Sequence, residues 1–179
     1  MSGCPTARCS ARSTTAWFSH AISCTRTASA RRRRASARRS TCIDESIDYA
    51  NARKPFGKPL SRNQAIQWPL VELNTEAEMI RWLIYRTAWE MDRMTGPEIQ
   101  LYLSDKVSMC NYRGNRLVCE AADWAMQVHG GWGYSRHKPF EHIYRHHRRY
   151  RITEGSEEIQ IRNVAGHMFG FIGKNRKAD

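Results

Sequence analysis

Residues 64–88, "QAIQWPLVELNTEAEMIRWLIYRTA", carry the clearest structural pattern in this chain. Its inward apolar residues recur every three or four positions, at Ile66, Leu70, Leu73, Ala77, Ile80, Ile84 and Ala88. This spacing places them on one stripe of an α-helix that faces a core. Ser61 is the N-cap that we expect for this helix. Pro69 lies inside the stripe and lacks a backbone N–H, so we expect a kink or a restart there.

A second stripe follows over residues 103–128. Its members are Leu103, Val107, Cys110, Leu117, Ala121, Trp124 and Val128. Gly114 lies on the same face, where it would permit close approach of another helix. "MTGPE" at 94–98 separates the two stripes, and Pro97 suits a first helical turn. Two long antiparallel helices without an alternating strand pattern predict an all-α helical bundle.

Shorter segments complete the predicted bundle. "CIDESIDYA" at 42–50 resembles the last turns of a helix, and "NARKPFGKPLSRNQ" at 51–64 is a connection broken by prolines and glycine. "KPFEHIYRHHRR" at 138–149 predicts a short helix. After "EGS" at 154–156, a last helix would place apolar residues on one side. Those residues are Ile161, Val164, Met168 and Phe171.

Composition predicts one helical domain over residues 43–173, with tails at 1–42 and 174–179. The chain has 179 residues and 41% apolar content, which is enough for a core. No apolar run approaches the roughly 18 residues needed to span a membrane. Residues 1–42 contain nine arginines and no acid, and thus supply nine of the twelve net positive charges. The domain itself is therefore nearly balanced, which argues against a nucleic-acid function.

The segment 1–42 is built mostly from Ser, Arg, Ala, Thr and Cys, and we expect it to be disordered. A transit peptide, a nucleic-acid-binding arm and a sequence not native to the domain would all have this composition. We favour the third explanation, a sequence not native to the domain, because residues 42–50 resemble the last turns of a helix whose first turns are missing. We accordingly expect a cytoplasmic location, with the mitochondrial matrix as the alternative.

The cysteines form no CxxC pair, and we expect free thiols in a reducing compartment. They are Cys4, Cys9, Cys24, Cys42, Cys110 and Cys119. His142 and His146 are spaced i,i+4, as two metal ligands on one helix would be. No third ligand at a useful spacing accompanies them, so a solvent-facing or partner-facing role is the simpler interpretation. The basic run "YRHHRRYR" at 144–151 could equally meet phosphates, an anionic cofactor or a neighbouring subunit.

Glu154 is the first candidate catalytic residue. Acids near a helix start usually reflect the helix dipole, and Glu157 and Glu158 fit that role after Ser156. Glu154 lies before that turn and is followed by Gly155, which lets the backbone bend sharply. A carboxylate directed into a dry cavity would have a raised pKa and could act as a general base. Nearby arginines and the helix N-terminus would lower the pKa, so both interpretations stay open.

"QVHGGWGY", residues 127–134, is a glycine-rich helix end. The simpler interpretation is a C-cap and turn, with Gly130, Gly131 and Gly133 stopping the helix. The functional interpretation is that bare backbone lets a phosphate or a flat ligand come close. A dinucleotide-binding fold of the Rossmann type is not supported, because the segment follows no strand and lacks the GxGxxG pattern.

Three motifs in order resemble the C-terminal domain of acyl-CoA dehydrogenases. They are "ARKPFGKPLSRNQAIQWPL" at 52–70, "QVHGGWGY", and the run that ends in "YRITEGSEEIQIRNVA" at 150–165. The resemblance extends from about residue 43 to 172. It implies an FAD-dependent oxidoreductase of fatty acid metabolism that converts an acyl-CoA to the trans-2-enoyl-CoA. A glutamate in an "EG(T/S)" turn, here Glu154, would remove the α-proton while a hydride leaves the β-carbon for the flavin.

The resemblance also implies FAD contacts in three segments. Arg53 and Phe56 match residues that reach the FAD of an adjacent subunit. Gln127, Gly130 and Gly131 match the segment that lies along the adenosine and pyrophosphate of FAD. Ser156 and Glu158 match further positions close to FAD. Many family members have a hydroxyl residue at the position of Pro55, and some have a glutamine at the position of Glu158. We therefore expect a homodimer or homotetramer that passes electrons to an electron-transfer flavoprotein or a similar acceptor.

The family's N-terminal helical domain and middle β-domain have no counterpart in this sequence. We therefore expect a fragment that binds FAD weakly and turns over poorly or not at all alone. Two alternatives come from other classes of function. One is a non-catalytic helical module that pairs with related chains, and the other is nucleic-acid binding through residues 1–42.

Overall fold

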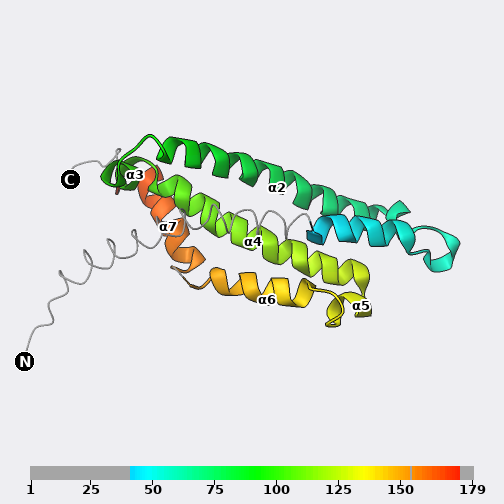
Figure 1. Ribbon diagram of the computed structural model, residues 1–179. Coiled ribbons are helices and arrows are strands. Elements are labelled where there is room, and N and C mark those ends of the chain that lie inside the picture. Colours follow the sequence, from blue (N-terminus) through cyan, green and yellow to red (C-terminus); the bar gives the residue numbers. More distant parts are fainter. Residues whose placement is uncertain (1–40, 154, 174–179) are drawn as a thin grey trace, which may run out of the picture.

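Helix α4, Ser104–His129, is the element around which the other helices pack (Figure 1). It contacts α2, α6 and α7, and it carries buried residues on more than one side. Leu117 and Ala122 are completely buried, and Val118 and Ala121 are each 2% exposed. Small alanine side chains let neighbouring helices approach, and the larger side chains fill the space between them.

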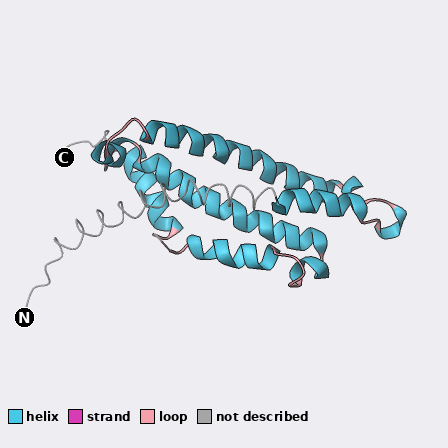
Figure 2. Cartoon of the chain, in the orientation of Figure 1, coloured by secondary structure: helices cyan, strands magenta, loops and turns pink. Residues whose placement is uncertain are grey.

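The computed structural model describes residues 41–153 and 155–173, and within these ranges it contains helices and no strand (Figure 2). A helix over residues 41–52 comes first. It is followed by η1 Pro55–Gly57, η2 Leu60–Arg62, α2 Gln64–Met91, α3 Gly96–Tyr102, α4, α5 Gly131–Tyr134, α6 Phe140–Tyr150 and α7 Glu157–Met168. The all-α prediction is confirmed.

The first predicted stripe forms the inner face of α2. Leu73, Ala77 and Ile80 are buried there, and they join a core cluster with α4 and α6. The expected N-cap, Ser61, is wrong, because Leu60–Arg62 forms a 3-10 turn before the helix. Asn63 is the N-cap instead, and its side-chain oxygen accepts a hydrogen bond from the Ala65 N–H at 3.0 Å. The helix continues through Pro69 without restarting.

The break predicted at 94–98 is confirmed, and Pro97 lies in the first turn of α3. Thr95 and Glu98 form a capping box in which the Thr95 N–H donates to the Glu98 carboxylate at 2.8 Å. The expectation that Gly114 permits a close helix contact is wrong. A Cβ placed there would have no neighbouring heavy atom within 4 Å among the described residues.

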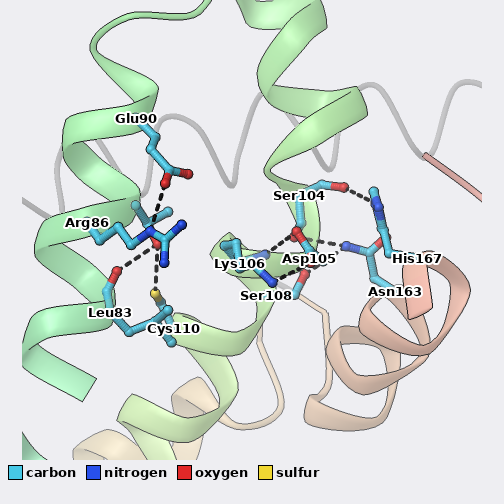
Figure 3. A network of polar contacts seen from close by, with 11 residues as sticks. Leu83, Arg86, Glu90, Ser104, Asp105, Lys106, Ser108, Cys110, Asn163 and His167 are labelled. Carbon is cyan, nitrogen blue, oxygen red and sulfur yellow. Dashed lines mark hydrogen bonds and ion pairs between the residues drawn. The ribbon is translucent and has the colours of Figure 1, made fainter. Parts of the chain in front are cut away.

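Polar contacts attach α7 to α4 (Figure 3). The Asn163 amide donates to the Ser104 carbonyl at 3.0 Å and to the Ser108 hydroxyl at 2.9 Å. The Ser104 hydroxyl lies 2.7 Å from His167 Nε2. The predicted apolar stripe is therefore only partly correct. Val164 is buried, whereas Ile161, Met168 and Phe171 are exposed, because the face of α7 turned to α4 uses hydrogen bonds.

Leu117→Ala tests whether α4 is the centre of the core. We expect it to lower the free energy of unfolding by about 2–5 kcal/mol, the usual cost of a Leu→Ala cavity in a packed core. Leu101→Ala on α3 is the matched control, because Leu101 is 42% exposed. Chemical denaturation followed by circular dichroism measures both changes. Equal losses would contradict the assignment of Leu117 to the core.

Candidate functional site

The predicted site residues lie in three segments at two places in the fold (Figure 1). The 127–134 segment lies at the end of the bundle where α4 finishes, and the 53–60 loop lies on the same side of the bundle but projects beyond that end, between the helix over 41–52 and α2. The 151–158 segment lies beyond the other end of α6, where the chain enters α7. Helix α6 has 11 residues, so it separates the two places by about 16 Å at a rise of 1.5 Å per residue.

The 53–60 loop presents an aromatic ring to the outside. Phe56 is fully exposed and has a positive φ of 56° with ψ 29°. This conformation is unusual for a bulky residue and costs free energy. The Leu60 N–H donates to the Arg53 carbonyl at 2.8 Å and closes the loop, and the Arg53 side chain is also exposed. The closed loop thus holds Phe56 in a conformation that the isolated residue would avoid.

The glycines of the 127–134 segment have different roles. Gly130 ends α4 with a φ of 61°, as predicted, and its N–H donates to the Gln127 carbonyl at 3.2 Å. A Cβ at Gly133 would come within 2.7 Å of the His129 Cβ, so packing requires this glycine. Gly131 does not have a positive φ. A Cβ placed on it would have no described heavy atom within 4 Å. Open space therefore flanks the backbone of Gly130 and Gly131, which fits close approach of a flat or anionic ligand.

His129 anchors this helix end, a role that the sequence did not reveal. Its side chain is buried, its ring is stacked on Tyr49 with centroids 4.3 Å apart, and it lies 4.7 Å from the ring of Phe140. Burial lowers the pKa of His129, and its Nδ1 donates to the Ala125 carbonyl at 2.8 Å, because a carbonyl oxygen can only accept. His129 therefore joins the helix over 41–52, α4 and α6 directly before the glycine pair.

An ion-pair clasp closes the turn that carries the predicted base. Glu154 itself lies outside the described residues, but the residues around it are placed. Arg151 donates from Nε and Nη2 to the two Glu157 carboxylate oxygens at 2.8 and 2.9 Å. Arg116 of α4 donates to the same carboxylate at 3.0 Å. Gly155 has a φ of 87°, so the prediction of a turn that depends on glycine is confirmed.

The clasp keeps Glu157 ionised. Hydrogen bonding from Arg151, with a further contribution from Arg116, lowers the pKa of Glu157 from its ordinary value to about 2. The Glu157 N–H also donates to the Arg151 carbonyl at 3.1 Å, so backbone and side chains close the same turn. Glu157 was expected only to complement the helix dipole, and its pairing with two arginines is an additional role. Arg116 was missed because it is 41 residues away in the sequence.

Ser156 and Glu158 lie next to the clasp. Ser156 is the N-cap of α7, and interaction with its side chain lowers the pKa of Glu158. The Glu158 side chain is exposed. The structure thus brings Ser156 and Glu158 together with the turn around 154. The other predicted contacts belong to the 53–60 loop and the 127–134 segment, which lie towards the other end of α6.

A groove of about 610 Å³ between α2 and α4 lies apart from these segments. Acidic side chains surround its apolar floor, and one of them, Glu76, pairs with Arg113. The lining residues are Pro69, Glu72, Leu73, Glu76, Met79, Ile80, Leu83, Arg113, Glu120, Asp123 and Trp124. None of the predicted site residues borders it.

The remaining candidates add no ligand site. The rings of His142 and His146 are stacked 6.1 Å apart. In residues 41–153 and 155–173, no three histidine, cysteine or acidic side chains are grouped as metal ligands would be. Among the described cysteines, Cys42 and Cys119 are buried and Cys110 is partly buried, and these three form no disulfide with one another. No helix in the described part of the chain is long and apolar enough to span a membrane.

Comparison with known proteins identifies the family. The family model "Acyl-CoA dehydrogenase, C-terminal domain" matches residues 15–169. Glutaryl-CoA dehydrogenase of Desulfococcus multivorans is 33% identical over 135 residues, covering 75% of this chain and 33% of its own length. Caffeyl-CoA reductase-Etf complex subunit CarC of Acetobacterium woodii is 32% identical over 124 residues, covering 69% of this chain and 31% of its own length.

A solved structure of glutaryl-coenzyme A dehydrogenase in complex with glutaryl-CoA superposes with a TM-score of 0.69 at 31% identity. The superposition covers 81% of this chain and 35% of that one. The chain thus spans about a third of the length of the relatives that it matches. The family match begins at residue 15, inside the segment 1–42, and the domain boundary at residue 43 stays a prediction. The chain belongs to the acyl-CoA dehydrogenase family, an oxidoreductase family, and corresponds to its C-terminal helical domain.

Proposed function

We propose that the protein functions in the FAD-dependent α,β-dehydrogenation of an acyl-CoA thioester to the trans-2-enoyl-CoA, with Glu154 as the general base. The observation that carries the proposal is the arrangement of the described residues on either side of Glu154. Gly155 has a positive φ, and the Arg151–Glu157 ion pair links the flanking segments 151–153 and 155–157. Bound FAD would accept the hydride that leaves the β-carbon. The enzymatic role of this chain rests on this turn and on its family.

The clasp also suits the electrostatics of a base. A free arginine beside a carboxylate would lower its pKa and weaken it as a base. Arg151 and Arg116 both direct donors at Glu157, so its negative charge offsets much of theirs. The α-proton of a thioester is only weakly acidic, so hydrogen bonds to the thioester carbonyl must stabilise the enolate-like charge. Glu154 would then have to remove the proton from a substrate that is already polarised.

The proposed FAD contacts use both ends of α6. Open space beside Gly130 and Gly131 leaves the backbone accessible to the adenosine and pyrophosphate, with Gln127 adjacent. Ser156 and Glu158 would contact the cofactor near the base. An elongated dinucleotide suits a site divided in this way.

Arg53 and Phe56 point away from their own bundle and would contact the FAD of an adjacent subunit. This arrangement supports a homodimer or homotetramer. An electron-transfer flavoprotein is the proposed electron acceptor, since one relative is named as a subunit of a reductase-Etf complex.

A second candidate function, a non-catalytic helical module, is favoured by the large apolar side chains exposed on α2, which suit helix pairing. Flavin separates the two functions. Purified protein with flavin absorbance supports the dehydrogenase. Colourless protein that takes up no added FAD, yet self-associates, supports the module.

Glu154→Gln tests the base. With FAD, butyryl-CoA and an artificial electron acceptor, we expect the variant to lose about 10²–10⁴-fold in kcat, the usual contribution of a general base. Its FAD affinity should stay unchanged, because the substitution removes only the proton acceptor. Glu141→Gln, in the first turn of α6, is the control. Undiminished turnover by Glu154→Gln would show that another residue is the base.

Phe56→Asn should separate stability from cofactor binding. Asparagine tolerates a positive φ, which costs other residues about 1–2 kcal/mol, so the free energy of unfolding should stay equal or rise. FAD binding should weaken by about 0.5–1.5 kcal/mol, the value of an aromatic contact. Fluorescence titration with FAD and thermal denaturation measure the two effects. Phe171→Asn is the control. Phe171 is exposed and lies outside the predicted site segments 53–60, 127–134 and 151–158, so its substitution should leave FAD affinity unchanged.

Glu157→Gln should remove the clasp and its pH dependence. We expect a loss of about 1.5–3 kcal/mol of unfolding free energy at pH 7, the range for hydrogen bonds to charged groups. The wild-type contribution is complete above the unfolded glutamate pKa of about 4.3 and disappears as the pH falls towards the folded pKa of about 2. The difference between wild type and variant should therefore be constant from pH 5 to 8 and shrink at lower pH.

Denaturation at a series of pH values measures this difference. Glu158→Gln is the adjacent control and should change stability little, because Glu158 is exposed and forms no ion pair with a described residue. A Glu157→Gln variant as stable as the wild type at pH 7 would show that the clasp contributes nothing to the closed turn.

A further inference from the structure

The ring of His129 is enclosed by three elements of the fold. It belongs to the last residue of α4, Tyr49 of the helix over 41–52 stacks on it, and the Phe140 ring of α6 lies beside it. His129 is only 3% exposed. The backbone of α5 packs on the same side chain, because a Cβ at Gly133 would come within 2.7 Å of the His129 Cβ. A displacement of the ring would therefore move residues 127–134, the glycine segment, relative to the bundle.

The two ring nitrogens of His129 differ in their partners. Nδ1 donates to the Ala125 carbonyl, so the single ring proton of neutral His129 is on Nδ1. Nε2 is buried and has no hydrogen-bond partner among the described residues. A second proton would bind to Nε2, where it would create a buried N–H donor without an acceptor on a charged ring. Such a group is costly to bury, because it loses its hydrogen bond to water.

The charges around His129 do not favour the second proton. Two charged side chains act on the ring, Glu45 from the helix over 41–52 and Lys138 from the turn before α6. They form an ion pair with each other at 2.7 Å, so an ammonium group already neutralises the Glu45 carboxylate. Tyr49 and Phe140 present only uncharged aromatic rings, and α5 presents backbone. Burial is the main cause that lowers the pKa of His129.

We propose that His129 is a positioning residue that holds the glycine segment closed only while its ring carries a single proton. Uptake of a proton at Nε2 would place a cation in a buried site without an acceptor, and the ring would move towards water. Because α5 packs on the same side chain, Gly130 and Gly131 would lose their fixed position together with the ring. The bundle would thus contain a pH-sensitive latch where a ligand meets bare backbone.

The hydrogen bonds of the glycine segment support this coupling. The Gly130 N–H donates to the Gln127 carbonyl, and the N–H groups of Gly133 and Tyr134 donate to the Gly130 carbonyl at 2.9 and 3.2 Å. These backbone bonds all lie within residues 127–134, so they do not tie the segment to another helix. The ring of His129 supplies such a tie through its stacking contacts. The inference rests on the proposed function in one respect, because FAD is the ligand that we propose for Gly130 and Gly131.

The latch has a defined pH range. In the open segment the ring takes up a proton as the pH falls through about 6.5, the ordinary histidine pKa. In the closed segment the ring stays neutral to a lower pH, because burial lowers the pKa of His129. Below about pH 6.5 the open form therefore binds more protons than the closed form. Closing weakens by up to about tenfold for each pH unit until the lower pKa is reached, and it is strongest above pH 6.5.

Amide hydrogen exchange of the full chain measures this opening. It is read by NMR at single residues and corrected for the intrinsic exchange rate at each pH. From pH 7.5 to pH 5.5 we expect the protection factors of the Gly133 and Tyr134 amides to fall about three- to tenfold. The Leu117 amide, in the core part of α4, should be better protected than both at each pH, as for a local opening. Constant protection at Gly133 and Tyr134, or protection equal to that of Leu117, would overturn the proposal.

Two substitutions remove the titrating ring and keep apolar contacts. His129→Phe keeps a ring that can stack on Tyr49, and His129→Leu is the smaller replacement if the phenyl ring overfills the site. In a folded variant the protection factors at pH 7.5 and 5.5 should be about equal. His142→Phe, at an exposed histidine of α6, is the matched control and should keep the wild-type ratio. A wild-type ratio in both His129 variants, or a ratio of one in His142→Phe, would overturn the proposal.

Lys138→Met tests the same ring without altering it. The substitution removes a neighbouring cation and frees the Glu45 carboxylate as a counter-charge for a protonated ring. Both changes favour the second proton in the closed form, so the loss of protection between pH 7.5 and 5.5 should be smaller than in the wild type. An equal or larger loss would contradict the assignment of the pH dependence to His129.

Added FAD separates this inference from the proposed function. At pH 7.5, FAD should raise the protection of the Gly133 and Tyr134 amides if it contacts the glycine segment. A pH-dependent opening that does not respond to FAD would keep the latch and remove the proposed cofactor contact. Protection that rises with FAD but does not change with pH would keep the cofactor contact and remove the latch.

Discussion

The burial of α4 on several sides is the constraint on which the rest of the structure depends. Only a helix with small residues such as Ala121, Ala122 and Ala125 at its contacts can hold three neighbours at packing distance. Its C-terminal end sets the position of the glycine segment, where His129 joins it to α6 and to the helix over 41–52. Earlier in the same helix, Arg116 reaches the clasp at the start of α7. One rigid element therefore positions both parts of the candidate site.

The two parts of the candidate site use the backbone in similar ways. At Gly130 and at Gly155 the chain takes a positive φ, and in each case side-chain interactions alongside limit the freedom that glycine brings. His129 is buried and stacked beside the first turn. The Arg151–Glu157 pair closes the second. A sharply bent and rigid turn is what a base or a cofactor contact requires, because its position must be held closely.

Helix α2 has two apolar faces, and only the inner one packs within the described bundle. Its inner face supplies buried residues to the core, whereas the large side chains of its outer face are 57–69% exposed. A helix with two apolar faces is consistent with a family domain that is a building block of a larger assembly. In the relatives, the matched region is about a third of the whole chain.

Features with local causes could be predicted from the sequence. The inner stripe of α2, the break before Pro97, the end of α4 at Gly130 and the bend at Gly155 each follow from a few neighbouring residues. Motif spacing also identified the family, which then indicated the base and the cofactor contacts. The N-cap at Asn63 was missed because a preceding 3-10 turn moved the helix start by two residues beyond the expected Ser61.

The tertiary structure decided the contacts between residues that are distant in the sequence. It buried Val164 but not Met168 on α7, because hydrogen bonds from Asn163 determine which face meets α4. It brought Arg116 to Glu157 across 41 residues. The sequence by itself determined the helices, the turns and the family, because these depend on local spacing. Which side chains meet, and which face of α2 is left uncovered, depended on how the helices pack, and periodicity carries no record of that packing.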